Sequence, residues 1–142
     1  MTWVFRLFAF LFLFIMINEQ LMKSDNVIES KSFEFAIRII RLYKYLMESK
    51  KEFVLSKQIL RSGTSIGANI SEGLQGMSKK DFIAKMSVSL KEAQETSYWL
   101  RLLNETEFIN ETEFKSLHAE LIELIKILTS ILKTSRGKIN TT

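Results

Sequence analysis

The chain has 142 residues, which is long enough for one domain with a well-buried core, and it contains no proline, no cysteine and one histidine. The absence of cysteine excludes disulfides, thiolate nucleophiles and cysteine-based metal sites, and it agrees with a reducing, cytoplasmic location. Because proline breaks helices and is common in turns, its absence, with 46% hydrophobic residues, predicts an all-α protein. The net charge of +4 suits a polyanionic ligand, although many proteins without such a ligand carry a similar charge.

Residues 1–21 form an apolar leader. Its uninterrupted apolar run, Leu7 to Ile17, is shorter than the roughly 20 residues that cross a bilayer, and the sequence INE at 17–19 lacks the small residues of a signal-peptide cleavage site. Met22 precedes the polar sequence KSDN and then amphipathic sequence. We therefore expect translation to start at Met22 and the leader to be a start-site extension. A membrane tether or signal-like segment is the alternative.

After Met22, apolar residues recur at helical spacing in four blocks, which predict helices over about residues 32–49, 54–75, 78–104 and 110–136. The first block is apolar on two faces. One stripe consists of Phe33, Ile37, Ile40 and Met47, and the other consists of Phe35, Ile39, Leu42 and Leu46.

The second block contains the sequence RSGTSIGANISEG, Arg61 to Gly73, which is crowded with small residues. A phosphate-binding loop would need G-x-x-x-x-G-K-[ST] after a strand, but Gly63 and Gly67 are separated by only three residues and no Lys-Ser or Lys-Thr follows them. On a helix, the two glycines lie one turn apart on one face, where they allow another helix to approach closely. Each glycine costs about 0.5–1 kcal/mol relative to alanine in a helix, so we expect packing to offset that cost.

Capping sequences begin the last two blocks. Ser78 is followed three residues later by Asp81, and Asn110 by Glu113, which are N-terminal capping patterns. The fourth helix has the clearest heptad seam, formed by Phe114, Leu117, Leu121, Leu124, Leu128 and Ile131. The pair Arg136-Gly137 is expected to end this helix, which leaves residues 138–142 as a disordered tail.

Four helices with short connections predict an antiparallel up-down four-helix bundle over residues 22–137. One bundle core needs only one apolar stripe per helix, but the fourth helix has a second stripe of Ile122, Ile125 and Leu132, and the first helix also has two. We therefore expect the surplus stripes to be buried against other subunits of a homo-oligomer.

Polar residues of the second helix are expected to have structural roles. Asn69 and Glu72 should form hydrogen bonds with the third helix, for example with Gln94 or Glu95, and fix the helix register. Arg61 should form an ion pair with a carboxylate at the same contact.

The sequence favours neither catalysis nor a cofactor. A di-iron site in a four-helix bundle uses glutamates and two E-x-x-H pairs, but His118 is the only histidine and has Lys115 three residues before it. One histidine also gives no recognisable Ser-His-Asp arrangement. We predict a protein that is not an enzyme and binds no metal.

The sequence LRSGTSIGANISEG is preceded by KSFEFAIRIIRLYKYL and followed by SKKDFIAKMSVSLKEAQETSYWLRLL. Together they resemble bacterial four-helix-bundle proteins encoded inside intervening sequences of 23S ribosomal RNA genes. The resemblance runs from about Asn26 to Lys133 and leaves out the leader. Members of this family form ring-like homopentamers, and similar accessory proteins of diversity-generating retroelements bind nucleic acid and a reverse transcriptase. The resemblance thus implies a pentameric bundle with a basic surface, but no particular biochemical activity.

Basic residues are the remaining functional candidates. We predict a homopentamer that binds structured RNA or DNA by charge rather than by reading bases, and the candidate contacts are Arg38, Arg41, Lys57, Lys79 and Lys80. Aromatic residues such as Tyr98 also suit base stacking, although at helical spacing they more often pack within the protein. The rival hypothesis is an adaptor that binds a reverse transcriptase or another protein. A third is a membrane-tethered bundle that uses the leader.

Overall fold

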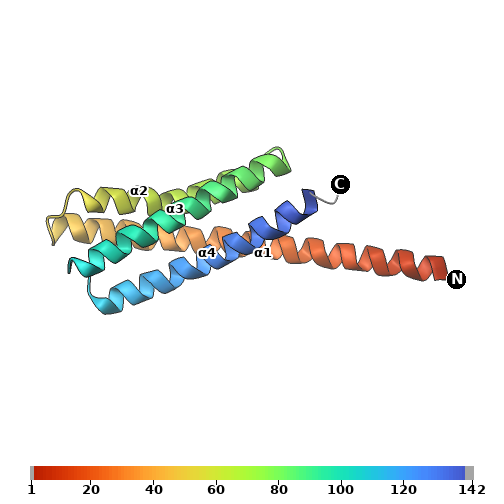
Figure 1. Cartoon of the computed structure of the whole chain (residues 1–142), viewed down its shortest axis with the longest axis horizontal. Coiled ribbons are helices and arrows are strands. Elements are labelled where there is room, and N and C mark those ends of the chain that lie inside the picture. Colours follow the sequence, from red (N-terminus) through yellow and green to blue (C-terminus); the bar gives the residue numbers. More distant parts are fainter. Residues whose placement is uncertain (1, 140–142) are drawn as a thin grey trace.

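The computed structural model describes residues 2–139, which form the helices α1 (Thr2–Glu48), α2 (Leu55–Leu74), α3 (Lys79–Glu105) and α4 (Glu111–Ile139). Residue 1 and residues 140–142 lie outside the described part of the chain. Consecutive helices run in opposite directions (Figure 1), and α1 and α3 each contact both α2 and α4. The prediction of an all-α, up-down four-helix bundle is confirmed.

The first helix is much longer than predicted, because α1 begins at Thr2 rather than near residue 32. No glycine or proline occurs before Gly63, so nothing in the leader or in the polar segment after it breaks the helix. The leader adds no buried side chain to the core, whose first apolar member is Ile28. It therefore extends α1 beyond the bundle (Figure 1).

The core contains one apolar stripe from each long helix. From α1 it buries Phe35, Ile39, Leu42 and Leu46, whereas Phe33, Ile37 and Ile40 of the second stripe remain exposed. From α4 it buries the predicted seam from Leu117 to Ile131. Leu132, which was predicted to lie in a subunit contact, is only 3% exposed within its own bundle. The reason is that positions 131 and 132 flank the centre of the seam at similar angles, so both face the core.

The two glycines of α2 allow α1 to approach closely, as predicted. A Cβ atom at Gly63 would lie 2.8 Å from both γ-carbons of Ile39, and a Cβ atom at Gly67 would lie 3.3 Å from the carbonyl oxygen of Ser32. Carbon atoms in ordinary contact are about 3.5–4.0 Å apart. Any larger residue at position 63 would therefore displace α1.

Side chains satisfy the free amides at three helix starts. The amide of Asp81 donates to the Ser78 hydroxyl at 3.1 Å, and the amide of Glu113 donates to the Asn110 side chain at 2.8 Å, so both predicted caps are confirmed. At the start of α2, the Glu52 carboxylate accepts hydrogen bonds from three amides. Partial burial alone would raise the pKa of Glu52, but these hydrogen bonds outweigh it and lower the pKa.

The last helix continues past Gly137, where we expected it to end, to Ile139. No glycine among the described residues has the positive φ of a helix-terminating turn. Residues 138 and 139, the start of the predicted tail, are therefore helical, and residues 140–142 lie outside the described part of the chain.

We expect Gly63→Ala to lower the free energy of unfolding by about 1–3 kcal/mol, because the added methyl group would overlap Ile39. Gly137→Ala is the matched control, since a Cβ there meets no described atom within 4 Å. It should leave stability unchanged or raise it slightly, because alanine favours the helix. Urea unfolding followed by circular dichroism measures both. Equal effects of the two substitutions would contradict the close contact at Gly63.

Candidate nucleic-acid interface

Short hydroxyl side chains join α2 to α3 inside the bundle. The hydroxyl groups of Ser62 and Thr96 lie 2.9 Å apart and both residues are buried. Ser89 donates a hydrogen bond of 2.9 Å to the carbonyl oxygen of Ile66. Because these side chains are short, they reach across only where the two helix backbones are close. They therefore hold α3 at a defined register along α2.

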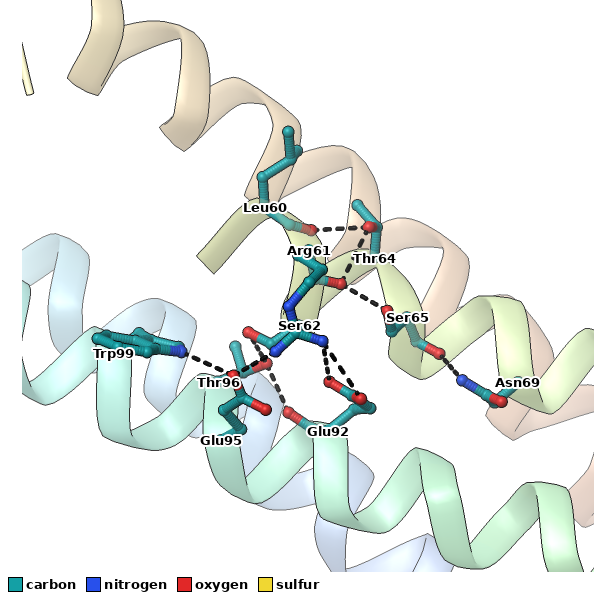
Figure 2. A network of polar contacts seen from close by, with 10 residues as sticks. All are labelled: Leu60, Arg61, Ser62, Thr64, Ser65, Asn69, Glu92, Glu95, Thr96 and Trp99. Carbon is teal, nitrogen blue, oxygen red and sulfur yellow. Dashed lines mark hydrogen bonds and ion pairs between the residues drawn. The ribbon is translucent and has the colours of Figure 1, made fainter. Parts of the chain in front are cut away.

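Arg61 connects the same two helices at the surface (Figure 2). Its guanidinium group forms ion pairs with Glu92, at 3.4 Å, and with Glu95, which also accepts a hydrogen bond of 3.1 Å from the indole of Trp99. The hydrogen bond from Arg61, and then that from Trp99, lower the pKa of Glu95. Arg61 thus pairs with both carboxylates on this side of α3 and offsets one of their two negative charges.

Arg61 pairs with carboxylates and Glu72 contacts the third helix, both as predicted, but the predicted role of Asn69 was wrong. The Asn69 amide donates to the carbonyl oxygen of Ser65 in its own helix, at 2.8 Å. Glu72 does contact α3, but it pairs with Lys85, at 2.6 Å. Because α2 and α3 are antiparallel around a short connection, residues near the end of α2 meet residues near the start of α3, and Gln94 lies too far along.

The solvent-facing side of α3 is basic over most of its length. Lys80, Lys91, Tyr98 and Arg101 lie within about 80° of one another around the helix, and the first and last are about 30 Å apart along its axis. All four are exposed. Among residues 2–139, no carboxylate forms an ion pair with the three cations. We call this surface the basic face of α3.

Two further features belong to the basic face of α3. Arg136, on α4, lies beside it and donates a hydrogen bond of 3.1 Å to the Ser87 hydroxyl. The ring of Tyr98 stands edge-on against Trp99, with 5.0 Å between ring centres, so its orientation is restricted. Glu105, at the far end of α3, is the carboxylate that interrupts this face. The basic face of α3 thus combines a row of cations with one aromatic ring, that of Tyr98, whose orientation is restricted.

The five predicted contact residues do not gather into one patch. Arg38 is committed to an ion pair with Glu120, at 2.5 Å. Arg41 and Lys57 are exposed near the α1–α2 connection, whereas Lys79 and Lys80 begin α3 at the opposite end of the bundle (Figure 1). The length of α2, about 30 Å, separates these two groups. Of the five, only Lys80 lies on the basic face of α3.

Sequence reasoning missed Lys91 and Arg101, although a signal for them was present. Lys91 lies opposite the buried positions Met86, Ala93 and Leu100 of α3, and Arg101 is exposed at the side of that buried stripe. In the sequence, Glu92 and Glu95 stand between these two cations and suggest that this part of α3 has little net charge. Only the structure shows that both carboxylates form ion pairs with Arg61.

The histidine of α4 has a structural environment. The imidazole of His118 lies 3.3 Å from the Ser97 hydroxyl and stacks on Phe114. Within the described part of the chain, no group of three histidine, cysteine, aspartate or glutamate side chains is placed to hold a metal ion.

Comparison with known proteins agrees with the bundle. A family model described as 23S rRNA-intervening sequence protein matches residues 24–130. Among solved structures, the chain is similar to a protein of unknown function from the S23 ribosomal protein family of Bacteroides thetaiotaomicron, with 55% sequence identity and a TM-score of 0.76. This similarity covers 78% of our chain and 98% of the Bacteroides chain. No match was found among curated proteins.

We expect Arg61→Gln to lower the free energy of unfolding by about 0.5–1 kcal/mol at neutral pH, because it removes the ion pairs of α2 with Glu92 and Glu95. Since the pKa of Glu95 is lowered in the folded protein, this contribution is present above the ordinary pKa of glutamate and is lost as the pH falls. The difference from the native sequence should therefore shrink in acid. Arg101→Gln, which breaks no ion pair, is the control. Urea unfolding at a series of pH values measures both, and a pH-independent difference would contradict the assigned role.

Proposed function

The chain belongs to the family of 23S rRNA-intervening sequence proteins, as its motifs predicted, and on that premise we propose that it is a non-enzymatic, homo-oligomeric bundle that binds structured RNA or DNA by charge in the cytoplasm. The basic face of α3 is the observation that supports this proposal most directly. Its cations have no carboxylate partner among the described residues, so they are available to phosphate groups.

The form of this face suits a nucleic-acid backbone better than base recognition. Lysine and arginine side chains at the surface contact phosphates without regard to sequence. Tyr98 supplies an exposed aromatic ring on which an unpaired base can stack, and such stacking tolerates any base. Lys80, Lys91 and Arg101 all lie on α3, so the distances between their backbone positions are fixed before binding. We therefore propose binding to backbone and shape, with little sequence preference.

Assembly would multiply this charge. The exposed stripe on α1 contains Phe33, which is 67% exposed, with Ile37 and Ile40 on the same side of the helix. A row of three large apolar side chains on one helix is typical of a subunit contact. We propose that this stripe joins subunits and, from the family resemblance, that the oligomer is a ring of five. Five copies of a chain with net charge +4 would strongly attract a polyanion.

A protein-binding adaptor is the second candidate. Val88 is exposed on α3 among the cations, and an apolar side chain there adds nothing to phosphate binding. A protein partner, such as a reverse transcriptase, would bury it. This candidate predicts that removing Val88 weakens binding to the protein and leaves binding to nucleic acid unchanged.

We expect the double substitution Lys91→Gln with Arg101→Gln to weaken binding to labelled structured RNA and duplex DNA. It should also reduce the slope of log affinity against log salt by about two, because roughly one counterion is released per phosphate contact. Arg41→Gln with Lys57→Gln is the charge-matched control and should have a much smaller effect. Fluorescence anisotropy across a salt series measures both pairs in residues 22–142, which retain every core residue.

Absence of binding at low salt by a folded oligomer would contradict the proposed function and favour the adaptor. Equal effects of the two pairs would contradict the assignment to α3, because binding would then depend only on total charge.

We expect Phe33→Asp with Ile37→Asp to dissociate the oligomer while leaving the helical content unchanged, because both side chains are exposed in the single subunit. Met77→Asp, at a fully exposed position in the α2–α3 connection, is the control and should leave the mass unchanged. Light scattering coupled to size exclusion, again on residues 22–142, gives the mass. A monomeric native sequence, or a variant of unchanged mass, would contradict the subunit contact at this stripe.

A further inference from the structure

The leader is an apolar helix whose side chains are exposed over almost all of its length. From Trp3 to Ile17 the large apolar side chains range from 86% to 41% exposed. The helix that carries them projects beyond the bundle, in line with the rest of α1 (Figure 1). Such a length of exposed apolar helix would be strongly unfavourable in water.

The apolar surface covers the whole circumference of this helix. Leu11, Phe12, Leu13 and Phe14 are consecutive, so they point in four directions, and each is more than half exposed. A groove on another protein covers one side of a helix and would leave the others in water. Lipid hydrocarbon surrounds a helix on every side.

The helix also has the length that a bilayer needs. One 18-residue window of α1, none of it buried, is long and apolar enough to cross a membrane by length and composition. Eighteen residues rise by about 27 Å, close to the roughly 30 Å of a hydrocarbon core. The prediction from the sequence that the leader is too short to cross a bilayer counted only the uninterrupted apolar run, Leu7 to Ile17. Because the helix continues to Thr2, Arg6 lies near its end, where a long cationic side chain can reach the headgroups.

The end of the bundle beside the leader is rich in unpaired cations. It comprises the start of the bundle part of α1, the start of α3 and the end of α4, and its cations are Lys23, Lys79, Lys80, Lys133 and Arg136. Within the described residues none of these forms an ion pair. A polybasic surface next to an inserted helix attracts anionic headgroups.

The carboxylates of Asp81, Asp25 and Glu19 offset part of that charge and leave an excess of cations at this end. Asp81 accepts a hydrogen bond from the Ser78 hydroxyl, at 2.7 Å, as part of the α3 cap. Asp25 is half-buried beside a small cavity that Lys79 also lines, and burial raises its pKa. Glu19 is the exposed carboxylate at the junction with the leader.

The apolar surface continues from the leader onto α4. Met16, Ile17 and Leu21 of α1 line an apolar groove of about 650 Å³ together with Ile127 and Ile131 of α4. Burial of the leader would therefore bury this groove as well, and it would bring the basic end of the bundle to the same depth as the headgroups.

We propose that the 18-residue apolar window at the start of α1 inserts into the hydrocarbon of an anionic lipid bilayer, and that the basic end of the bundle rests on its phosphate headgroups. The excess of cations on the bundle side of the inserted helix keeps the bundle on the cytoplasmic side. Lys80 and Arg136 would face the headgroups, but Lys91, Tyr98 and Arg101 lie further along α3, away from this end, so that part of the basic face remains open to solution. Membrane insertion is thus independent of the proposed function.

The test is flotation of the full chain, synthesised without cells in the presence of vesicles of phosphatidylcholine alone or with one quarter phosphatidylglycerol. The native sequence should float with both, and more completely with the anionic vesicles. Leu11→Asp with Phe12→Asp should lower partitioning by about a hundredfold or more, because each carboxylate must enter hydrocarbon. Phe53→Asp with Val54→Asp is the matched control, since these apolar side chains are equally exposed at the opposite end of the bundle. It should float like the native sequence.

A second pair of variants tests the contribution of the basic end to the preference for anionic vesicles. Lys79→Gln with Lys80→Gln should lower the preference for anionic vesicles by about tenfold or more, whereas Lys50→Gln with Lys51→Gln, at the opposite end, should not change it. Equal preferences in these two variants would overturn the contact between the basic end and the headgroups.

Three results would overturn insertion itself. One is that the native full chain stays in solution as a stable oligomer, since its leader would then be covered by other copies. Another is that the Leu11 and Phe12 variant floats as the native chain does. The third is an intact mass, for protein made from the native gene, that begins at Met22. None of these results bears on nucleic-acid binding by residues 22–142.

Discussion

The close approach of α2 to both of its neighbours is the contact on which the bundle depends. On one side, Gly63 and Gly67 leave space for Ile39 and for the backbone of α1. On the other side, Ser62 of α2 accepts a hydrogen bond from Thr96 of α3, and Ser89 of α3 donates one to the carbonyl oxygen of Ile66 of α2. Larger side chains at these positions would move α1 and α3 away from α2 and open the core between the helices. The close packing therefore offsets the loss of helix stability that the two glycines cause.

The same contact decides where charge remains on the surface. Once α2 and α3 are held in register, Arg61 lies opposite Glu92 and Glu95, pairs with both and offsets part of the negative charge on that side of α3. The solvent side of the same helix keeps Lys91 and Arg101 without partners among the described residues. A chain of modest net charge thereby acquires one strongly basic helix face. The proposed nucleic-acid binding is thus a consequence of helix packing and not of composition.

The unbroken first helix makes the two ends of the bundle different. One end has the leader in line with the rest of α1 (Figure 1), and its exposed cations are Lys23, Lys79, Lys80, Lys133 and Arg136. The other end has the α1–α2 and α3–α4 connections; Glu107 lies in the latter, and Glu111 begins α4 beside it. A membrane would cover only the first end. The side of α3 would remain in solution, so one molecule could hold a lipid surface and a polyanion at once.

The sequence by itself determined the number of helices, their caps at Ser78 and Asn110, the apolar stripes and the family. These features depend on residues within one or two turns of each other, whose spacing is visible in the chain. Only the tertiary structure decided which polar groups meet, because the register of an antiparallel pair depends on the length of its connection and on contacts between distant residues. That is why Glu72 pairs near the start of α3, why Arg61 leaves α3 with a basic face, and why Leu132 lies in the core of its own bundle.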